Sequence, residues 1–174
     1  ARRQRQMCIR DSWMTEQDLI EVNILALTRM CHALGNAMAL HGGGQILNVA
    51  SVAAFQPGPW MSSYYASKAY VLHFSEGLRE ELKTCGIKVS VLCPGPTRTP
   101  FFGTAHMDTA KLDRSGQLMS PEEVALYTVR ALEKNKAIII PGRRNRWLAF
   151  SPRLSPRWLT RKIAGAINKA YCPR

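Results

Sequence analysis

Apolar positions along the chain follow two patterns, a helical period in long segments and continuous apolar runs in short ones. Apolar residues recur at helical spacing from Leu19 onward, which predicts a helix over residues 15–40. Thr15, with Asp18 three residues later, is typical of a helix start, and the glycine run 42–44 is expected to end the helix.

Three short apolar runs, at residues 45–51, 87–92 and 137–140, are bounded by glycine or proline. Runs of this length without alternation are typical of parallel strands buried on both faces. We therefore expect three parallel strands.

Two further helices are predicted between these strands. One runs over residues 62–85 and stops at Gly86, and the other opens with Ser-Pro-Glu-Glu and runs over 120–134. Helices and strands thus alternate, which predicts an α/β layered fold with a parallel sheet. Residues 97–119 show no period and are expected to form a long loop.

Charge divides the chain into three parts. Of the net charge of +12, residues 1–12 carry +3 and residues 143–174 carry +9, so residues 13–142 are neutral. A nucleic-acid-binding fold would spread its cations over a face of the body, so this distribution argues against one. The first twelve residues resemble a translated adapter sequence, or else form a disordered basic arm.

The tail at 143–174 interleaves aromatic and aliphatic residues with arginine and lysine. Such a basic amphipathic segment either lies on an anionic membrane surface or caps the core or a partner subunit. No apolar run is long enough for a membrane-spanning helix, so we expect a cytoplasmic protein, in solution or at a membrane surface. The five scattered cysteines are expected to be reduced and mostly buried, with no metal site.

Candidate chemistry lies at the ends of the predicted elements. Tyr64 and Lys68 are one helical turn apart, and a nearby ammonium group is expected to lower the pKa of the phenol. Ser51 ends the first strand, at the sheet edge where ligands of open α/β sheets bind, and can hydrogen-bond a substrate carbonyl. The Pro94-Gly95 turn follows the second strand.

These features, together with Asn23, resemble the short-chain dehydrogenase/reductase family in the text GQILNVAS, YYASKAYVLHFSEGLREEL and GIKVSVLCPGPTRT. The resemblance implies a Rossmann-like doubly wound parallel sheet, of which residues 13–142 hold the last three strands with their helices. It also implies carbonyl–alcohol interconversion by hydride transfer, with NAD or NADP as the cofactor and a small-molecule substrate.

By the same resemblance, Tyr64 is the general acid/base, Lys68 lowers its pKa and holds the nicotinamide ribose, and Ser51 orients the carbonyl. Asn23 anchors a water of the proton relay. The residues expected to contact the nicotinamide are Pro94, Gly95, Thr97 and Thr99. The family also implies a homo-oligomer packed through the helices at 15–40 and 62–85.

The sequence lacks two features of the family, the TGxxxGxG turn that cradles the pyrophosphate and the later NNAG segment. The chain is therefore expected to be a C-terminal fragment that is inactive alone, with an exposed edge at its first strand. Loop residues Phe101 and Phe102 are compatible with a lipid-like substrate.

Two other readings remain possible. A non-catalytic interaction module would keep the fold without the chemistry. A serine hydrolase is suggested by His41-Gly42-Gly43-Gly44, which resembles an oxyanion-hole segment, but the chain has no GxSxG elbow.

Overall fold

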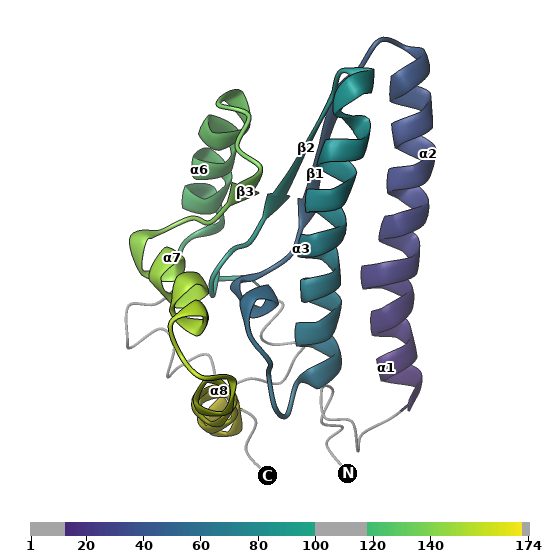
Figure 1. The fold of residues 1–174 in the computed structure, drawn as a ribbon. Helices are drawn as coiled ribbons and strands as arrows, with labels where there is room; N and C mark the ends of the chain where they lie inside the picture. Colours follow the sequence, from purple (N-terminus) through teal and green to yellow (C-terminus); the bar gives the residue numbers. More distant parts are fainter. Residues whose placement is uncertain (1–12, 100–117, 172–174) are drawn as a thin grey trace.

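The computed structural model describes residues 13–99 and 118–171. Predictions for residues 1–12 and for Phe101 and Phe102 lie outside these ranges. The described chain forms a three-stranded parallel sheet in the order β1-β2-β3, with helices on both faces, as the sequence predicts (Figure 1). No helix of the described residues is both long and apolar enough to cross a membrane.

The first helical segment is longer and less regular than its apolar period predicts. It consists of α1 (Trp13–Ile20), a π-helical segment (Glu21–Ala26) and α2 (Leu27–Leu40). The predicted start at Thr15 is wrong, since the helix already includes Trp13. The predicted end is correct, because His41 follows α2 as its C-cap and Gly42 takes a positive φ of 85°.

The remaining elements follow the predicted order, with shorter strands. They are β1 (Gly44–Val49), a 3₁₀ turn (Val52–Phe55), α3 (Ser62–Leu82), a 3₁₀ turn (Lys83–Cys85), β2 (Ile87–Leu92), α6 (Pro121–Glu133) and β3 (Ile138–Ile139). Gly86 stops the second helical segment with a φ of 71°. The third strand has two residues instead of the predicted four.

The C-terminal segment is folded. It forms α7 (Arg143–Phe150), a 3₁₀ turn (Ser151–Arg153) and α8 (Arg157–Tyr171), which lie beyond the carboxyl edge of the sheet (Figure 1). The sequence predicts one amphipathic tail, whereas the structure has two helices separated by prolines.

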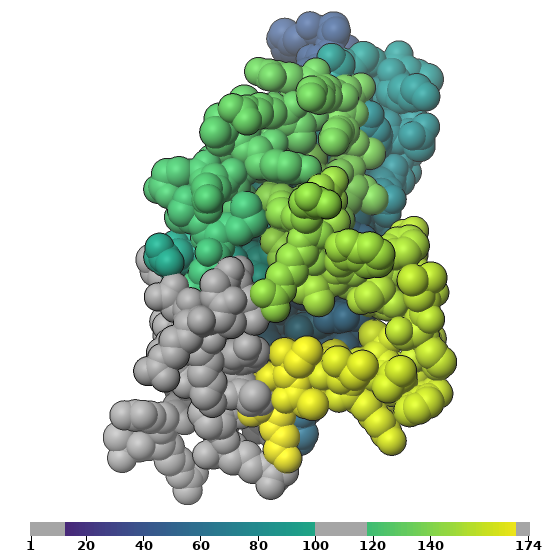
Figure 2. Space-filling model, turned by 90° about the vertical axis from the view of Figure 1, so that its left-hand side faces the viewer, coloured from purple at the N-terminus to yellow at the C-terminus, as the bar shows by residue number. Residues whose placement is uncertain are grey.

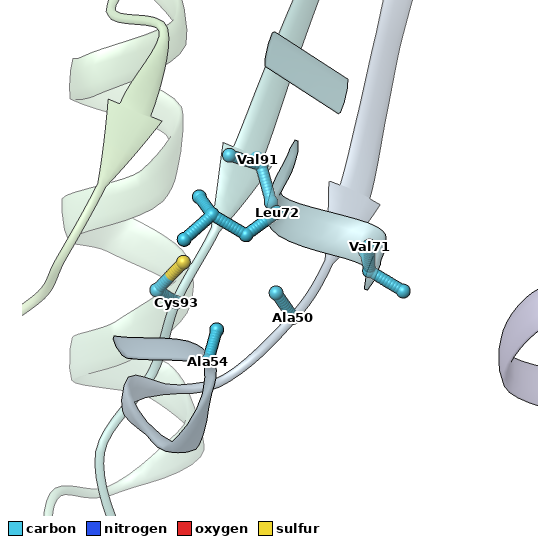
Figure 3. Close-up of a cluster of buried hydrophobic side chains, with 6 residues drawn as sticks. All are labelled: Ala50, Ala54, Val71, Leu72, Val91 and Cys93. Carbon is cyan, nitrogen blue, oxygen red and sulfur yellow. The ribbon is translucent and has the colours of Figure 1, made fainter. Parts of the chain in front are cut away.

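Two apolar layers hold the sheet. Helices α2 and α3 cover one face through Cys31, Ile46, Ile87 and Val89, and α6 covers the other through Val124, Ala131, Leu92 and Ile139. A third cluster lies at the carboxyl end of β2, where Ala50, Ala54, Val71, Leu72, Val91 and Cys93 pack together (Figure 3). This cluster supports the strand ends that carry the predicted site.

The prediction that the first strand is buried on both faces is wrong for β1. In β1, Gln45 and Val49 are exposed while Ile46 and Asn48 are buried. Within the described part of the chain, β1 also forms one edge of the sheet, because it pairs with β2 alone. Of the cysteines described, Cys31 and Cys93 are buried and Cys85 is exposed.

Candidate active site

The carboxyl ends of β1 and β2 are joined by backbone hydrogen bonds that continue past the strands. Val49 is paired with Leu92, so the residues two positions further on, Ser51 and Pro94, follow side by side. The amide of Val52 donates to the carbonyl of Pro94 over 3.0 Å. Parallel pairing thus brings together two segments that are more than forty residues apart in the sequence.

The sequence predicts Ser51 as the last residue of the first strand. In the structure it lies two residues beyond the end of β1. Its backbone is extended (φ −168°, ψ 162°), and it caps the 3₁₀ turn that follows: its Oγ accepts a hydrogen bond from the amide of Ala53 over 3.1 Å. This bond fixes the hydroxyl at the edge of the sheet, beside the first turn of α3.

Tyr64 and Lys68 lie in the first two turns of α3, as their spacing predicts. The ammonium of Lys68 is 5.9 Å from the centroid of the Tyr64 ring and donates to the carbonyl of Val49 over 3.1 Å. Tyr64 shares a hydrogen bond with the side chain of Ser51. Three of the four predicted catalytic side chains, those of Ser51, Tyr64 and Lys68, therefore form one cluster between the end of β1 and α3.

The direction of the Tyr64 pKa differs from the expectation. Burial raises the pKa of Tyr64 above its ordinary value of 10.0, and the hydrogen bond from Ser51 opposes this effect without overcoming it. Burial also lowers the pKa of Lys68, because it disfavours the charged ammonium, while the nearby Cys93 acts in the opposite direction. The expected net lowering of the Tyr64 pKa is therefore wrong for this arrangement, because burial outweighs the opposing effect.

Asn23 lies in the π-helical segment, a helical irregularity that is frequent at functional sites. Its Nδ2 donates to Ser67 Oγ over 3.0 Å, and Ser67 Oγ donates to the carbonyl of Tyr64 over 2.8 Å. Asn23 is thus linked to the backbone of Tyr64 through a side chain that is 1% exposed. Sequence reasoning missed Ser67, although it lies inside the YYASK segment.

The Pro94-Gly95-Pro96 turn is held from the C-terminal side by Asn145. A Cβ on Gly95 would overlap the Asn145 carboxamide, which is 6% exposed and whose Nδ2 donates to the carbonyl of Pro141 over 2.7 Å. Sequence reasoning also missed Asn145. Its position could have indicated a role, because Asn145 follows Pro141-Gly142 at the carboxyl end of the third strand.

The two predicted threonines follow this turn. Thr97 Oγ1 donates to the carbonyl of Gly95 over 3.0 Å, and Thr97 bridges to Met119. Thr99 is exposed and its hydroxyl donates to the carbonyl of Thr97 over 3.4 Å. Thr97 is therefore part of the turn, whereas Thr99 lies at the limit of the described segment.

The geometry does not favour serine hydrolase chemistry. The glycines 42–44 lie at the start of β1, whereas Ser51 follows its end, so a strand of roughly 20 Å separates them. An oxyanion hole must lie within hydrogen-bond distance of the nucleophile's target. Among the described residues there is also no group of three or more histidine, cysteine or acidic side chains suited to a metal ion.

Comparisons with known proteins agree with this geometry. The family model described as short chain dehydrogenase matches residues 4–110. The chain is 34% identical over 135 residues to the probable oxidoreductase EphD of Mycobacterium tuberculosis, covering 69% of this chain and 23% of that protein. It is 34% identical over 112 residues to human dehydrogenase/reductase SDR family member 4, covering 61% and 40%.

Among solved structures, a short-chain dehydrogenase from Sphingobium yanoikuyae in complex with NADPH is similar, with a TM-score of 0.75 and 31% identity. The match covers 87% of this chain and 59% of that one. The chain thus spans less than two thirds of each of these relatives. The sheet, its flanking helices and the matched sequence agree that this chain belongs to the short-chain dehydrogenase family.

Proposed function

We propose that the protein interconverts a carbonyl compound and an alcohol, with Tyr64 as the general acid/base and a nicotinamide cofactor, NAD or NADP. The observation that carries the proposal is the cluster of Tyr64, Ser51 and Lys68, held at the carboxyl ends of two parallel strands. Ligands of open α/β sheets bind at this edge.

The residues of the turn fit a nicotinamide. The turn lies beside the Ser51 segment, with the Val52 amide donating to the carbonyl of Pro94, so a flat ring bound at this sheet edge would lie next to the cluster. Lys68 is the one cation among the predicted site residues, and it would hold the ribose. A bound nicotinamide cofactor supplies or accepts the hydride. The similar Sphingobium yanoikuyae protein, solved with NADPH, supports this assignment.

Each side chain has a distinct role in carbonyl reduction. Ser51 Oγ hydrogen-bonds the carbonyl oxygen and fixes its position next to the phenol. Tyr64 is a protonated phenol near neutral pH, and it donates its proton to that oxygen as negative charge develops on it. Lys68, fixed by the Val49 carbonyl, places a positive charge near the phenolate that remains.

The test is made on a full-length protein that includes this chain, by following hydride transfer through nicotinamide absorbance with a panel of aldehydes, small ketones and steroid-like ketones. Tyr64→Phe should lower kcat by at least about a hundredfold, the usual contribution of a general acid. The matched control is Tyr70→Phe, which removes another phenol from α3, one that is hydrogen-bonded to Thr28 over 2.8 Å. Equal activity of the two variants, or no turnover by the intact protein with any carbonyl, contradicts the proposal.

We also propose that the protein is a homo-oligomer packed through α1–α2. Val22, Leu25, Met30 and Leu34 on this segment are 66%, 49%, 61% and 43% exposed. Exposed apolar side chains on a helix are compatible with a subunit interface. Sedimentation equilibrium of a Met30→Asp variant should give a lower mass than the unmodified protein, and an unchanged mass contradicts this interface.

A further inference from the structure

Helix α8 contacts the body of the protein through small and polar side chains. Its buried residues are Thr160, Ala164 and Asn168. Asn168 Oδ1 accepts a hydrogen bond from the Tyr65 hydroxyl and its Nδ2 donates to the carbonyl of Pro59, each over 3.0 Å. These two bonds fix the rotation of the helix about its axis.

This rotation leaves the large apolar residues of α8 in solvent. Trp158, Ile163 and Ile167 are 55%, 51% and 49% exposed. In an ordinary surface helix the apolar stripe faces the core and the polar side faces water. In α8 the contact with the core is made by the small and polar side chains instead, so packing among the described residues does not explain the exposed apolar side chains.

The exposed apolar side chains continue through α7 and the turn that joins the two helices. We call residues 143–171 the basic apolar surface; Figure 2 shows it in lime and yellow beside the green α6. Its exposed large apolar residues are Trp147, Leu148, Phe150, Leu154, Trp158, Ile163 and Ile167.

The same surface carries positive charge only. Eight cations are exposed and residues 143–171 contain no acid. The cations are Arg143, Arg144, Arg146, Arg153, Arg157, Arg161, Lys162 and Lys169. None of them forms one of the ion pairs found among the described residues, which join His73 to Glu76 and Lys83 to Glu80.

Two of these cations line a recess. Arg157 and Arg161, together with Tyr65 and the segment 54–59, surround an open pocket of about 580 Å³ between α3 and α8. Figure 2 shows a hollow between α7 and α8, with blue atoms of the earlier chain visible at its floor. A phosphate group entering from the surface would meet two guanidinium groups, the preferred partners of phosphate oxygens.

We propose that the basic apolar surface binds an anionic lipid bilayer, with α8 lying in the headgroup region. Such binding needs apolar side chains to enter the interface and cations to meet the lipid phosphates, and this surface exposes both. A second copy of the chain fits less well, because a two-fold contact would set this acid-free surface against itself. Nucleic acid would leave Ile163 and Ile167 without an apolar partner.

The test is sedimentation of the protein with vesicles of phosphatidylcholine alone or of phosphatidylcholine with phosphatidylglycerol. Binding should need the anionic lipid and should weaken as salt is raised. Ile163→Gln/Ile167→Gln should reduce it by at least about tenfold, because two apolar side chains no longer enter the interface. Lys162→Gln/Lys169→Gln should reduce it by roughly fivefold for each lysine removed.

The matched control is Leu126→Gln/Val129→Gln on α6, where both apolar residues are 54% exposed outside the surface. This variant should bind vesicles as the unmodified protein does. Equal binding to neutral vesicles, or no binding to either kind, overturns the proposal. A lower mass of Ile163→Gln/Ile167→Gln in sedimentation equilibrium, without vesicle binding by the unmodified protein, assigns the surface to a second copy. Vesicle binding does not depend on turnover, so the proposed oxidoreductase activity is tested separately.

Discussion

Replacing Gly95 by alanine should destabilise the protein through a single neighbouring side chain. The added Cβ would overlap the carboxamide of Asn145, and that side chain cannot swing aside without losing its hydrogen bond to the Pro141 carbonyl. Overpacking of a closely packed site costs about 1–3 kcal/mol, and a lost buried hydrogen bond is of similar size. We expect Gly95→Ala to lower the free energy of unfolding by about 2 kcal/mol.

A double-mutant cycle separates this contact from other causes. Asn145→Ala alone should cost about 1–3 kcal/mol, because the Pro141 carbonyl loses its donor. In Gly95→Ala/Asn145→Ala the new methyl group occupies space that the carboxamide has vacated, so the double variant should be about as stable as Asn145→Ala. Urea unfolding followed by circular dichroism measures all four proteins.

Gly77→Ala is the matched control. Gly77 lies in the middle of α3, and a Cβ there would meet nothing within 4 Å. Alanine in a helix interior is more favourable than glycine by about 0.5–1 kcal/mol, so this variant should be more stable than the unmodified protein. If the effects of Gly95→Ala and Asn145→Ala simply add, within about 0.5 kcal/mol, the two residues do not contact as described.

Three further predictions concern ionisation and helix capping. Burial raises the pKa of the Cys93 thiol from 9.0 to about 12, so its contribution to stability is complete below about pH 9 and is lost as the pH rises towards 12. In this window, urea unfolding should show the free energy of unfolding falling by up to roughly 1.4 kcal/mol per pH unit, and Cys93→Ala should not show this fall. Ser120 Oγ accepts from the Glu123 amide and the Glu123 carboxylate accepts from the Ser120 amide, so Ser120→Ala should lower the free energy of unfolding by about 1 kcal/mol; an unchanged urea midpoint contradicts this capping box. A phenolate absorbance titration of the unmodified protein minus Tyr64→Phe should place the pKa of Tyr64 above 10.0, and Ser51→Ala should raise it further; a difference transition near neutral pH contradicts this direction.

Much of the fold could be predicted because local residues determine it. The glycines after α2 and α3 take positive φ angles that other residues rarely adopt, so both helix ends were readable from the sequence. The strand at 87–92 was predicted with its correct bounds, since it is apolar and buried on both faces. The sequence predicts a regular helix over residues 15–40 and not the π-helical segment within it.

The partly exposed β1 was not predicted because exposure depends on which elements lie over a strand. Strand composition gives its hydrophobicity and not its place in the sheet. The composition of the tail likewise shows that it is basic and amphipathic. Which side of α8 faces the body is determined by the contacts of Asn168 with Tyr65 and Pro59, which the composition does not show.

Some residues of the candidate site could be predicted from the sequence and others could not. Tyr64, Lys68 and Pro94 lie in the elements that the sequence predicts for them, and Ser51 lies two residues beyond the end of β1 instead of within the strand. Asn145 was missed, since it reaches the Pro94-Gly95 turn from 50 residues away in the chain. Contacts of this kind depend on tertiary packing, for which the sequence gives no local signal.

The spacing of Tyr64 and Lys68 in the sequence predicts that they are close, but it does not predict whether the pKa of Tyr64 is raised or lowered. The spacing of four residues correctly predicts that Lys68 and Tyr64 are neighbours, with the ammonium 5.9 Å from the ring. The pKa is a balance in which burial disfavours the phenolate more than Ser51 favours it. A buried phenol beside a fixed serine hydroxyl therefore keeps its proton to a higher pH than an exposed tyrosine does, although an ammonium lies 5.9 Å from its ring.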